Sequence, residues 1–156
     1  MRRPAYPTDN LYPCFENVLK ALDGKPKGIV VKSTIPPGTT ERWNQKFDTN
    51  IVFNPEFLTE RNAVSDYENQ NRIILGGPRP TTTELKQIFS KVFPSADIIK
   101  TDSTHAEMVK YTTNTFLSVK VSFANEIHQL CDKLDIDYDK VIEYATYDER
   151  LGKSHW

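Results

Sequence analysis

Four short apolar runs, separated by segments with helical spacing, constrain the fold of this chain more than any other feature. They span residues 28–31, 51–53, 72–75 and 97–100. Each run is nearly continuous in apolar residues, as is typical of strands that are covered on both faces of a parallel sheet. Strands of this kind that alternate with helices indicate an open α/β sheet. We therefore predict a partial parallel sheet of about four strands within residues 1–102.

Helical spacing occupies the segments between the strands. It predicts helices over residues 39–46 and 84–92, the second of which begins with a capping box of Thr81 and Glu84. Before the first strand, the spacing predicts a short helix over residues 15–22. Prolines keep the chain ahead of that helix extended or looped, and a glycine closes it: Pro4, Pro7, Pro13 and Gly24.

From Ser103 onward the pattern is uninterrupted helical spacing, because no glycine or proline occurs between Ser103 and Gly152. This predicts one helix over residues 104–134, opened by a capping box of Thr104 and Glu107. Its length is on the order of 45 Å at about 1.5 Å per residue. Such a helix outruns a compact domain of this size, so we expect it to pack against something outside the domain.

A second helix is predicted over residues 138–147, with Asp137 as its N-cap. Residues 103–156 are therefore expected to form a second, helical region.

Composition excludes several classes of function. The net charge is −1, from 20 Lys and Arg against 21 Asp and Glu, which gives no electrostatic case for binding nucleic acid or a membrane surface. No apolar stretch is long enough to span a bilayer, and no apolar run follows the charged N-terminus as it would in a signal peptide. Cys14 and Cys131 are too few for a disulfide framework. We expect a soluble, cytoplasmic protein.

Two arrangements resemble metal sites, and we reject both. The Asp-x-Asp-x-Asp sequence that begins at Asp135 looks like an EF-hand loop, but Lys140 and Thr146 stand where that loop needs Gly and Glu. His128 and Cys131 lie three apart on the long helix, but no second pair of ligands accompanies them. We expect no metal site.

Polar side chains follow the first two predicted strands. In open α/β sheets, ligands bind beyond the carboxyl ends of the strands. The segments 32–39 and 54–60 should meet there and bring the Thr34 hydroxyl and the Glu56 and Glu60 carboxylates to one crevice. The residues alone leave an alternative open, in which the Pro-Pro-Gly sequence is only a turn and the glutamates only begin a helix.

The long helix carries a second candidate site. Lys110 and Asn114 lie four residues apart and therefore on one helix face, where further polar residues continue the stripe. A cation beside a neutral amide donor suits the stabilisation of a developing oxyanion. The alternative is an ordinary solvated stripe.

Several motifs stand in one order and register from about residue 28 to the end of the sequence. They are residues 31–40, 54–58, 62–66, 72–76, 106–111, 114–117, 123–126 and 148–152. Together they resemble the UDP-glucose/GDP-mannose dehydrogenase family. The resemblance implies that residues 1–102 are the later half of a Rossmann-like NAD-binding domain and that residues 103–156 begin a central helical dimerisation domain.

The resemblance also implies a four-electron oxidation. Two NAD molecules take the primary alcohol of UDP-glucose, or of GDP-mannose as the alternative, through an aldehyde and a cysteine thioester to the carboxylate. Lys110 and Asn114 would bind the substrate and stabilise its oxyanion, and Thr34 and Glu56 would hold a catalytic water. Glu60 would act near the nicotinamide as an acid/base or cofactor contact, with Thr34 as a second cofactor contact.

Further contacts with the substrate follow from the same resemblance. The backbone around Phe57 and Leu58 would line the sugar. Arg150 would reach the nucleotide sugar across a homodimer that forms through the helix at 104–134. Thr59 departs from the family pattern, in which many members carry Arg.

Two family motifs have no counterpart in this sequence. No G-x-G-x-x-G precedes residue 28, and neither Cys14 nor Cys131 lies in a Gly-Gly-x-Cys motif. We therefore expect part of an NAD-dependent nucleotide-sugar dehydrogenase, inactive or slow as this chain alone and completed by the remainder of the enzyme. The alternative is a non-catalytic dimerisation or regulatory module from a truncated dehydrogenase gene.

Overall fold

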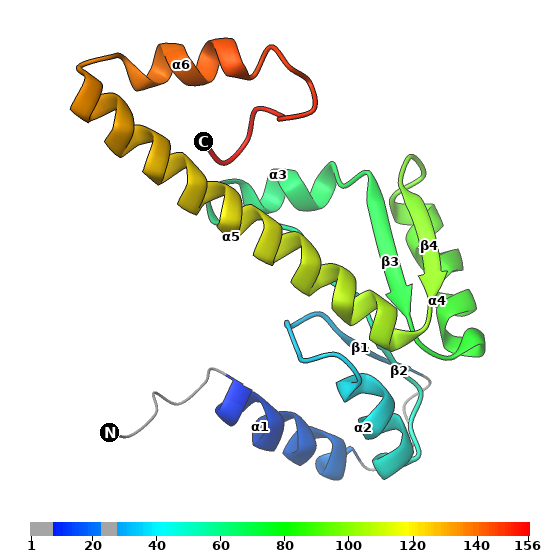
Figure 1. Ribbon diagram of the computed structural model, residues 1–156. Coiled ribbons are helices and arrows are strands. Elements are labelled where there is room, and N and C mark those ends of the chain that lie inside the picture. Colours follow the sequence, from blue (N-terminus) through cyan, green and yellow to red (C-terminus); the bar gives the residue numbers. More distant parts are fainter. Residues whose placement is uncertain (1–7, 23–27) are drawn as a thin grey trace, which may run out of the picture. The chain divides into compact units, whose positions relative to one another are not determined.

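The computed structural model describes residues 8–22 and 28–156. Its elements are α1 (Thr8–Ala21), β1 (Ile29–Val31), α2 (Thr39–Phe47), β2 (Ile51–Phe53), η1 (Glu60–Asn62), α3 (Ala63–Glu68), β3 (Arg72–Gly76), α4 (Arg79–Val92), β4 (Asp97–Thr101), α5 (Ser103–Leu134) and α6 (Tyr138–Ala145) (Figure 1). They belong to two compact units, Met1–Lys110 and Tyr111–Trp156, so that α5 contributes to both.

The four strands form one sheet in the order β1-β2-β3-β4, which confirms the predicted α/β sheet of four strands. β1 pairs with β2 and β3 pairs with β4 in parallel. β2 and β3 run antiparallel and meet at Phe53 and Gly76, so the sheet is mostly parallel, with one antiparallel pair.

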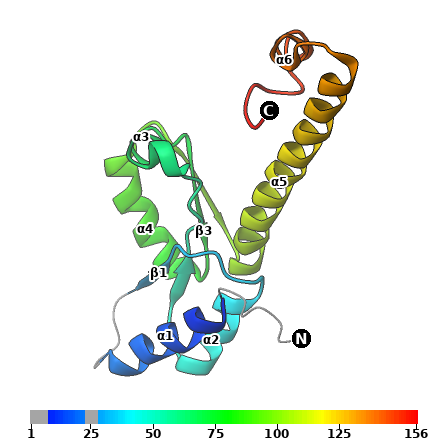
Figure 2. The ribbon, with the colours of Figure 1, turned by 90° about the vertical axis from the view of Figure 1, so that its left-hand side faces the viewer.

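The core of the first unit lies on both faces of the sheet. β2 is buried at every position, and its alternating side chains divide between two clusters. One cluster contains Leu19, Val31, Ile35, Trp43, Ile51, Phe53, Ile74 and Ala106; the other contains Val52, Ile73, Leu75 and Phe93. α1 and α2 lie side by side, and their Phe15 and Trp43 rings stack 4.2 Å apart (Figure 2).

β4 departs from the prediction of strands covered on both faces. Its residues are exposed or half-buried, and the Ile99 side chain is 49% exposed. β4 stands at the end of the strand order, which leaves it the edge position of this sheet.

The helices end close to where the apolar spacing predicts, but α1 and α4 begin several residues earlier than predicted. α5 and α6 occupy the predicted segments, and the Asp137 side chain accepts a hydrogen bond from the Lys140 amide as an N-cap does. α4 begins earlier than predicted, with Pro78 at the N-cap and no side-chain cap, so the Thr81–Glu84 capping box is wrong.

The N-terminal prediction is also corrected. α1 begins at Thr8 and includes Pro13 in its interior, where an extended chain was predicted. Pro4, Pro7 and Gly24 lie outside the described residues.

The second unit consists of the remainder of α5, α6 and the C-terminal segment. Ala124 and Cys131 of α5 are buried within it. The Lys120 ammonium donates to the backbone carbonyls of Leu151, at 2.7 Å, and Gly152, at 3.3 Å. Among the described helices, none is long and apolar enough to cross a membrane.

We predict that two alanine substitutions of the same residue type will differ sharply in effect. Ile73→Ala removes a side chain that is 2% exposed and should lower the free energy of unfolding by about 2–5 kcal/mol. Ile88→Ala, at a side chain that is 58% exposed on α4, should change it by about 0.5 kcal/mol or less. Urea unfolding followed by the emission of the buried Trp43 measures both, and equal losses would contradict this assignment of the core.

Candidate active site

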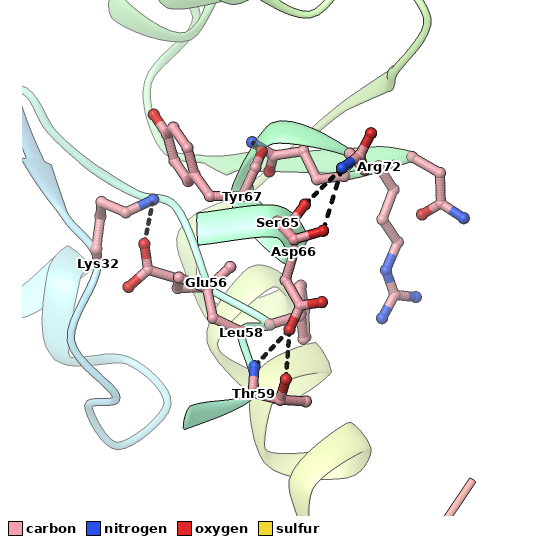
Figure 3. Close-up of a pocket in the computed structure, with 12 residues that line it drawn as sticks. Lys32, Glu56, Leu58, Thr59, Ser65, Asp66, Tyr67 and Arg72 are labelled. Carbon is pink, nitrogen blue, oxygen red and sulfur yellow. Dashed lines mark hydrogen bonds and ion pairs between the residues drawn. The ribbon is translucent and has the colours of Figure 1, made fainter. Parts of the chain in front are cut away.

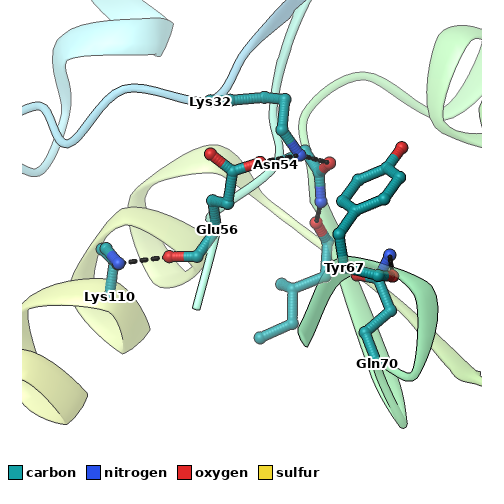
Figure 4. Close-up of polar contacts among 7 residues, drawn as sticks. Lys32, Asn54, Glu56, Tyr67, Gln70 and Lys110 are labelled. Carbon is teal, nitrogen blue, oxygen red and sulfur yellow. Dashed lines mark hydrogen bonds and ion pairs between the residues drawn. The ribbon is translucent and has the colours of Figure 1, made fainter. Parts of the chain in front are cut away.

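The segments that follow β1 and β2 meet at the carboxyl ends of these strands, as predicted. The Asn54 amide donates to the Val31 carbonyl at 2.9 Å and so continues the pairing beyond the last strand residue. The Asn54 side chain donates to the Ile74 carbonyl at 2.9 Å and accepts from the Lys32 ammonium at 3.1 Å (Figure 4). One buried asparagine therefore joins β1, β2 and β3 at this edge.

Glu56 is held at two points. Its carboxylate forms an ion pair with Lys32 at 3.2 Å, with both side chains 37% exposed. Its backbone carbonyl accepts a hydrogen bond from the Lys110 ammonium of α5 (Figure 4). Glu56 and Lys110, both predicted site residues, are thus in contact, although through the backbone of Glu56 and not through its carboxylate.

The Lys110 ammonium is half-buried beside an aromatic ring. It lies 5.1 Å from the centre of the Phe57 ring, and the Arg72 guanidinium lies 4.4 Å from the same ring. Burial lowers the pKa of Lys110 from its ordinary value, and the Glu56 carboxylate offsets part of that effect. The charged form is therefore retained by specific neighbours in a partly dry position.

A cavity of about 560 Å³ opens between the segment after β2, α3 and the start of β3 (Figure 3). Its polar and aromatic lining includes Lys32, Glu56, Phe57, Leu58, Asp66, Tyr67 and Arg72. At its rim the Thr59 amide and hydroxyl donate to one oxygen of Asp66, at 2.8 and 2.6 Å. These two bonds lower the pKa of Asp66 and close the segment into a loop.

The other predicted residues of the first unit stand apart from this lining. Thr34 is exposed in the segment between β1 and α2, and Glu60 is exposed as the first residue of η1. Both follow the carboxyl ends of their strands, but only Glu56, Phe57 and Leu58 of the predicted post-strand residues line the cavity.

Asn114 and Arg150 belong to the second unit. Asn114 is exposed one turn beyond Lys110 on α5. Arg150 is exposed, and its guanidinium Nε donates to the Asp148 carboxylate at 2.9 and 3.1 Å. This contact raises the pKa of Arg150 and lowers that of Asp148.

Sequence reasoning missed four residues that shape the site. Lys32, Asp66, Tyr67 and Arg72 line the cavity with the predicted residues. Lys32 could have been found, because it is the first residue beyond β1 and therefore stands at the strand ends. Arg72 could not, because its place depends on the antiparallel direction of β3.

The residues considered as metal ligands have other partners. His128 forms an i,i+4 contact with Asp132 at 3.3 Å and lies 4.7 Å from the Tyr138 ring, while Cys131 is buried. Within residues 8–22 and 28–156, no group of three His, Cys, Asp or Glu side chains is arranged to hold a metal ion.

An open α/β sheet with polar groups at its strand ends defines a broad class of ligand-binding proteins, and the comparison with known families narrows it. The NAD binding domain of the UDP-glucose/GDP-mannose dehydrogenase family matches residues 8–96, and the central domain of that family matches residues 104–156. The chain therefore belongs to the UDP-glucose/GDP-mannose dehydrogenase family, whose cofactor is NAD. The predicted family and Rossmann-like fold are confirmed.

Individual relatives agree with this assignment. The UDP-glucose 6-dehydrogenase of Campylobacter jejuni is 36% identical over 143 residues, which cover 88% of this chain and 36% of the relative. TuaD, a UDP-glucose 6-dehydrogenase of Bacillus subtilis, is 34% identical over 135 residues, which cover 81% of this chain and 29% of the relative. The chain thus spans about a third of the length of these curated relatives.

Solved structures resemble the chain to a similar extent. A UDP-glucose dehydrogenase from Pyrobaculum islandicum superposes with a TM-score of 0.74 at 35% identity and covers 82% of this chain and 31% of that protein. A ternary complex of GDP-mannose dehydrogenase from Pseudomonas aeruginosa superposes with a TM-score of 0.79 at 26% identity. The match covers 100% of this chain and 40% of that protein.

We predict that Lys110 titrates below the ordinary lysine value of 10.5, because burial disfavours its charged form. The Lys110 Cε chemical shift of the labelled chain measures this midpoint. Glu56→Gln should lower the Lys110 midpoint further, since the Glu56 carboxylate favours the ammonium. A Lys110 midpoint at or above 10.5 in the unchanged chain would disprove the burial effect.

The lowered pKa of Lys110 also gives the stability of the first unit a pH dependence. Between that pKa and the ordinary value of 10.5, the unfolded chain binds more protons at Lys110 than the folded chain does. The contribution of Lys110 to the free energy of unfolding therefore rises with pH across this interval, and its unfavourable part is largest below it.

Proposed function

We propose that this chain forms part of an NAD-dependent dehydrogenase that oxidises UDP-glucose to UDP-glucuronate by two hydride transfers. In this proposal, residues 1–102 contribute to the NAD domain and residues 103–156 begin the central domain. The contact between Lys110 and Glu56 at the strand ends carries the proposal, because it puts a partly dry cation where a family substrate would meet the sheet. Support also comes from the family membership.

Lys110 would act on the oxygen of the substrate alcohol. As the alcohol gives its proton to the water held by Glu56 and Thr34, negative charge develops on that oxygen. An ammonium already positioned by the Glu56 carbonyl would stabilise this alkoxide without reorganisation until the C=O bond forms and the hydride leaves the carbon. The Asn114 amide, one turn further along α5, would donate to the same oxygen. Glu56, whose carboxylate is paired with Lys32, would hold a water together with Thr34.

The described residues suit the nicotinamide end of NAD but not its pyrophosphate. Thr34 and Glu60 are exposed after β1 and β2 and suit the nicotinamide end. The pyrophosphate has no matching site on α2, because the Gly38 and Thr40 amides at the start of α2 already bond to Glu107. NAD, when bound, accepts the hydride. The remaining phosphate contacts would come from the remainder of the enzyme.

The identity of the substrate and its contacts are further parts of the proposal. Phe57 and Leu58 line the cavity beside Arg72 and would contact the sugar, and Arg150 would reach the nucleotide sugar. UDP-glucose is favoured over GDP-mannose because the relatives at 34–36% identity are UDP-glucose 6-dehydrogenases. A cytoplasmic location is favoured by two cysteines that are both free thiols.

We predict that a chimera, in which this chain replaces the matched segment of the Campylobacter jejuni relative, forms NADH from UDP-glucose and NAD. Lys110→Ala should lower its kcat by about 10²–10³-fold, the usual cost of removing one donor to a developing oxyanion. Absorbance of NADH measures the rate. The chain alone should form no stoichiometric NADH, because no G-x-G-x-x-G precedes residue 28 to hold the pyrophosphate of NAD. The second oxidation additionally lacks its cysteine, since neither Cys14 nor Cys131 lies in a Gly-Gly-x-Cys motif.

Lys86→Ala is the matched control for this experiment, because Lys86 is an exposed lysine of α4 outside the cavity lining. It should leave kcat unchanged. A non-catalytic dimerisation or regulatory module makes the opposite prediction, that Lys110→Ala is as silent as Lys86→Ala. If the purified chain alone formed stoichiometric NADH, the proposal that its activity depends on the remainder of the enzyme would be refuted.

The proposed homodimer rests on an exposed apolar stripe along α5 within the second unit. Each member lies three, four or seven residues from the next one, so all of them share one helix face. They are Phe116, Val119, Phe123, Leu130 and Leu134, each more than half exposed. An apolar face of this kind is favourable to bury against a second copy.

We predict that the chain sediments as a dimer and that Val119→Asp shifts it to a monomer, because a carboxylate would be desolvated in the interface. Val92→Asp is the matched control, since Val92 is an exposed valine of α4 that is 62% accessible. It should leave the dimer intact. Sedimentation velocity measures all three, and a stable monomer at high concentration of the unchanged chain would contradict the homodimer.

A further inference from the structure

Glu107 is a fully buried carboxylate on the second turn of α5. The sequence predicted it as a helix cap for its own helix, which is wrong. α5 begins at Ser103, so Thr104 lies inside the helix and does not precede it. The Asp102 carboxylate caps α5 instead, because it accepts a hydrogen bond from the His105 amide at 2.9 Å. The Glu107 carboxylate points instead to α2.

All the partners of Glu107 that the described residues provide are donors at the start of α2. One carboxylate oxygen accepts from the Gly38 amide. The other accepts from the Thr40 amide at 2.8 Å and the Thr40 hydroxyl at 2.6 Å. α2 has Gly38 at its N-cap and no local side-chain cap, so Glu107 caps it from a position 67 to 69 residues further along the chain. Negative charge is favourable at that helix end.

A buried carboxylate is a costly way to join two helices, because its desolvation opposes the gain from its hydrogen bonds. An apolar side chain of similar volume would fill the space. What the carboxylate provides is direction, since three bonds to two residues fix both the position and the rotation of α5 against α2. This argues for a role beyond packing.

Lys110 lies one turn beyond Glu107 on α5, at the i+3 position that shares its face. Glu107 binds the end of the segment after β1, and Lys110 binds the Glu56 carbonyl in the segment after β2. α5 also packs closely against β3 at its first turn. A Cβ added to Gly76 of β3 would lie only 2.4 Å from the Cβ of Ala106, so no larger residue fits there. One turn of α5 therefore connects both post-strand segments.

We propose that Glu107 is a positioning residue, which caps α2 from α5 and so holds the segment 32–38 and the Lys110 ammonium in one arrangement at the strand ends. This role rests on the proposed function for its catalytic meaning. The arrangement itself does not, so it is tested on the full chain without catalysis.

The test compares Glu107→Gln and Thr40→Val with the unchanged chain by the titration of Lys110 and by hydrogen exchange. Glu107→Gln turns one acceptor into a donor that faces N–H groups. We expect exchange of the Gly38 and Thr40 amides to accelerate at least tenfold and the Lys110 midpoint to rise toward the ordinary lysine value of 10.5. The direction is diagnostic, because removing a negative charge without moving Lys110 would lower its midpoint.

Thr40→Val removes the hydroxyl bond and leaves the carboxylate charged, so it also serves if Glu107→Gln fails to fold. We expect the same upward shift of the Lys110 midpoint, smaller in size. Ile73→Val is the control, because it weakens the core on the other face of the sheet and should not move Lys110. A Lys110 midpoint that stays or falls in Thr40→Val would overturn the inference and leave the chimera assay of the proposed function unaffected.

Discussion

The parallel pairing of β1 with β2 is the interaction on which the rest of the site depends. β2 is buried along its whole length, so its register with β1 cannot slip without moving apolar side chains to the wrong face. Because the strands run in the same direction, the segments after Val31 and Phe53 leave the sheet at one edge. Asn54 extends that pairing by one residue and delivers Glu56 to the cavity and to Lys110.

The elements of the fold could be predicted because each has a clear period in the sequence. Short apolar runs marked the strands, and the glycine-free stretch marked α5 to within one residue of its observed start. Helix caps could not be predicted from four-residue motifs. Glu107 satisfied a local capping pattern, but donors on α2, some 67 residues away in sequence, bind its carboxylate in the structure. Strand direction was equally hidden, since the apolar period of β3 is the same whether it runs parallel or antiparallel.

The site could be predicted in part for the same reason. Strand-end geometry indicated that Glu56 would meet other polar groups, and the structure brings it to Lys110. The partner of its carboxylate, Lys32, and the stacking of Arg72 on Phe57 depend on side-chain placement that no spacing reveals. Asn114 and Arg150 belong to the second unit, so their contribution to the site stays a prediction.

The two anchors of α5 also bear on how the first unit folds. The contacts among the post-strand segments join residues close in sequence, with Lys32 and Asn54 only 22 apart. Those of α5 close much longer loops, 54 residues for Lys110 and 67 to 69 for Glu107. Closing a longer loop costs more chain entropy, and long-range contacts slow folding. The two anchors of α5 therefore carry a larger chain-entropy cost than the contacts within the sheet edge do.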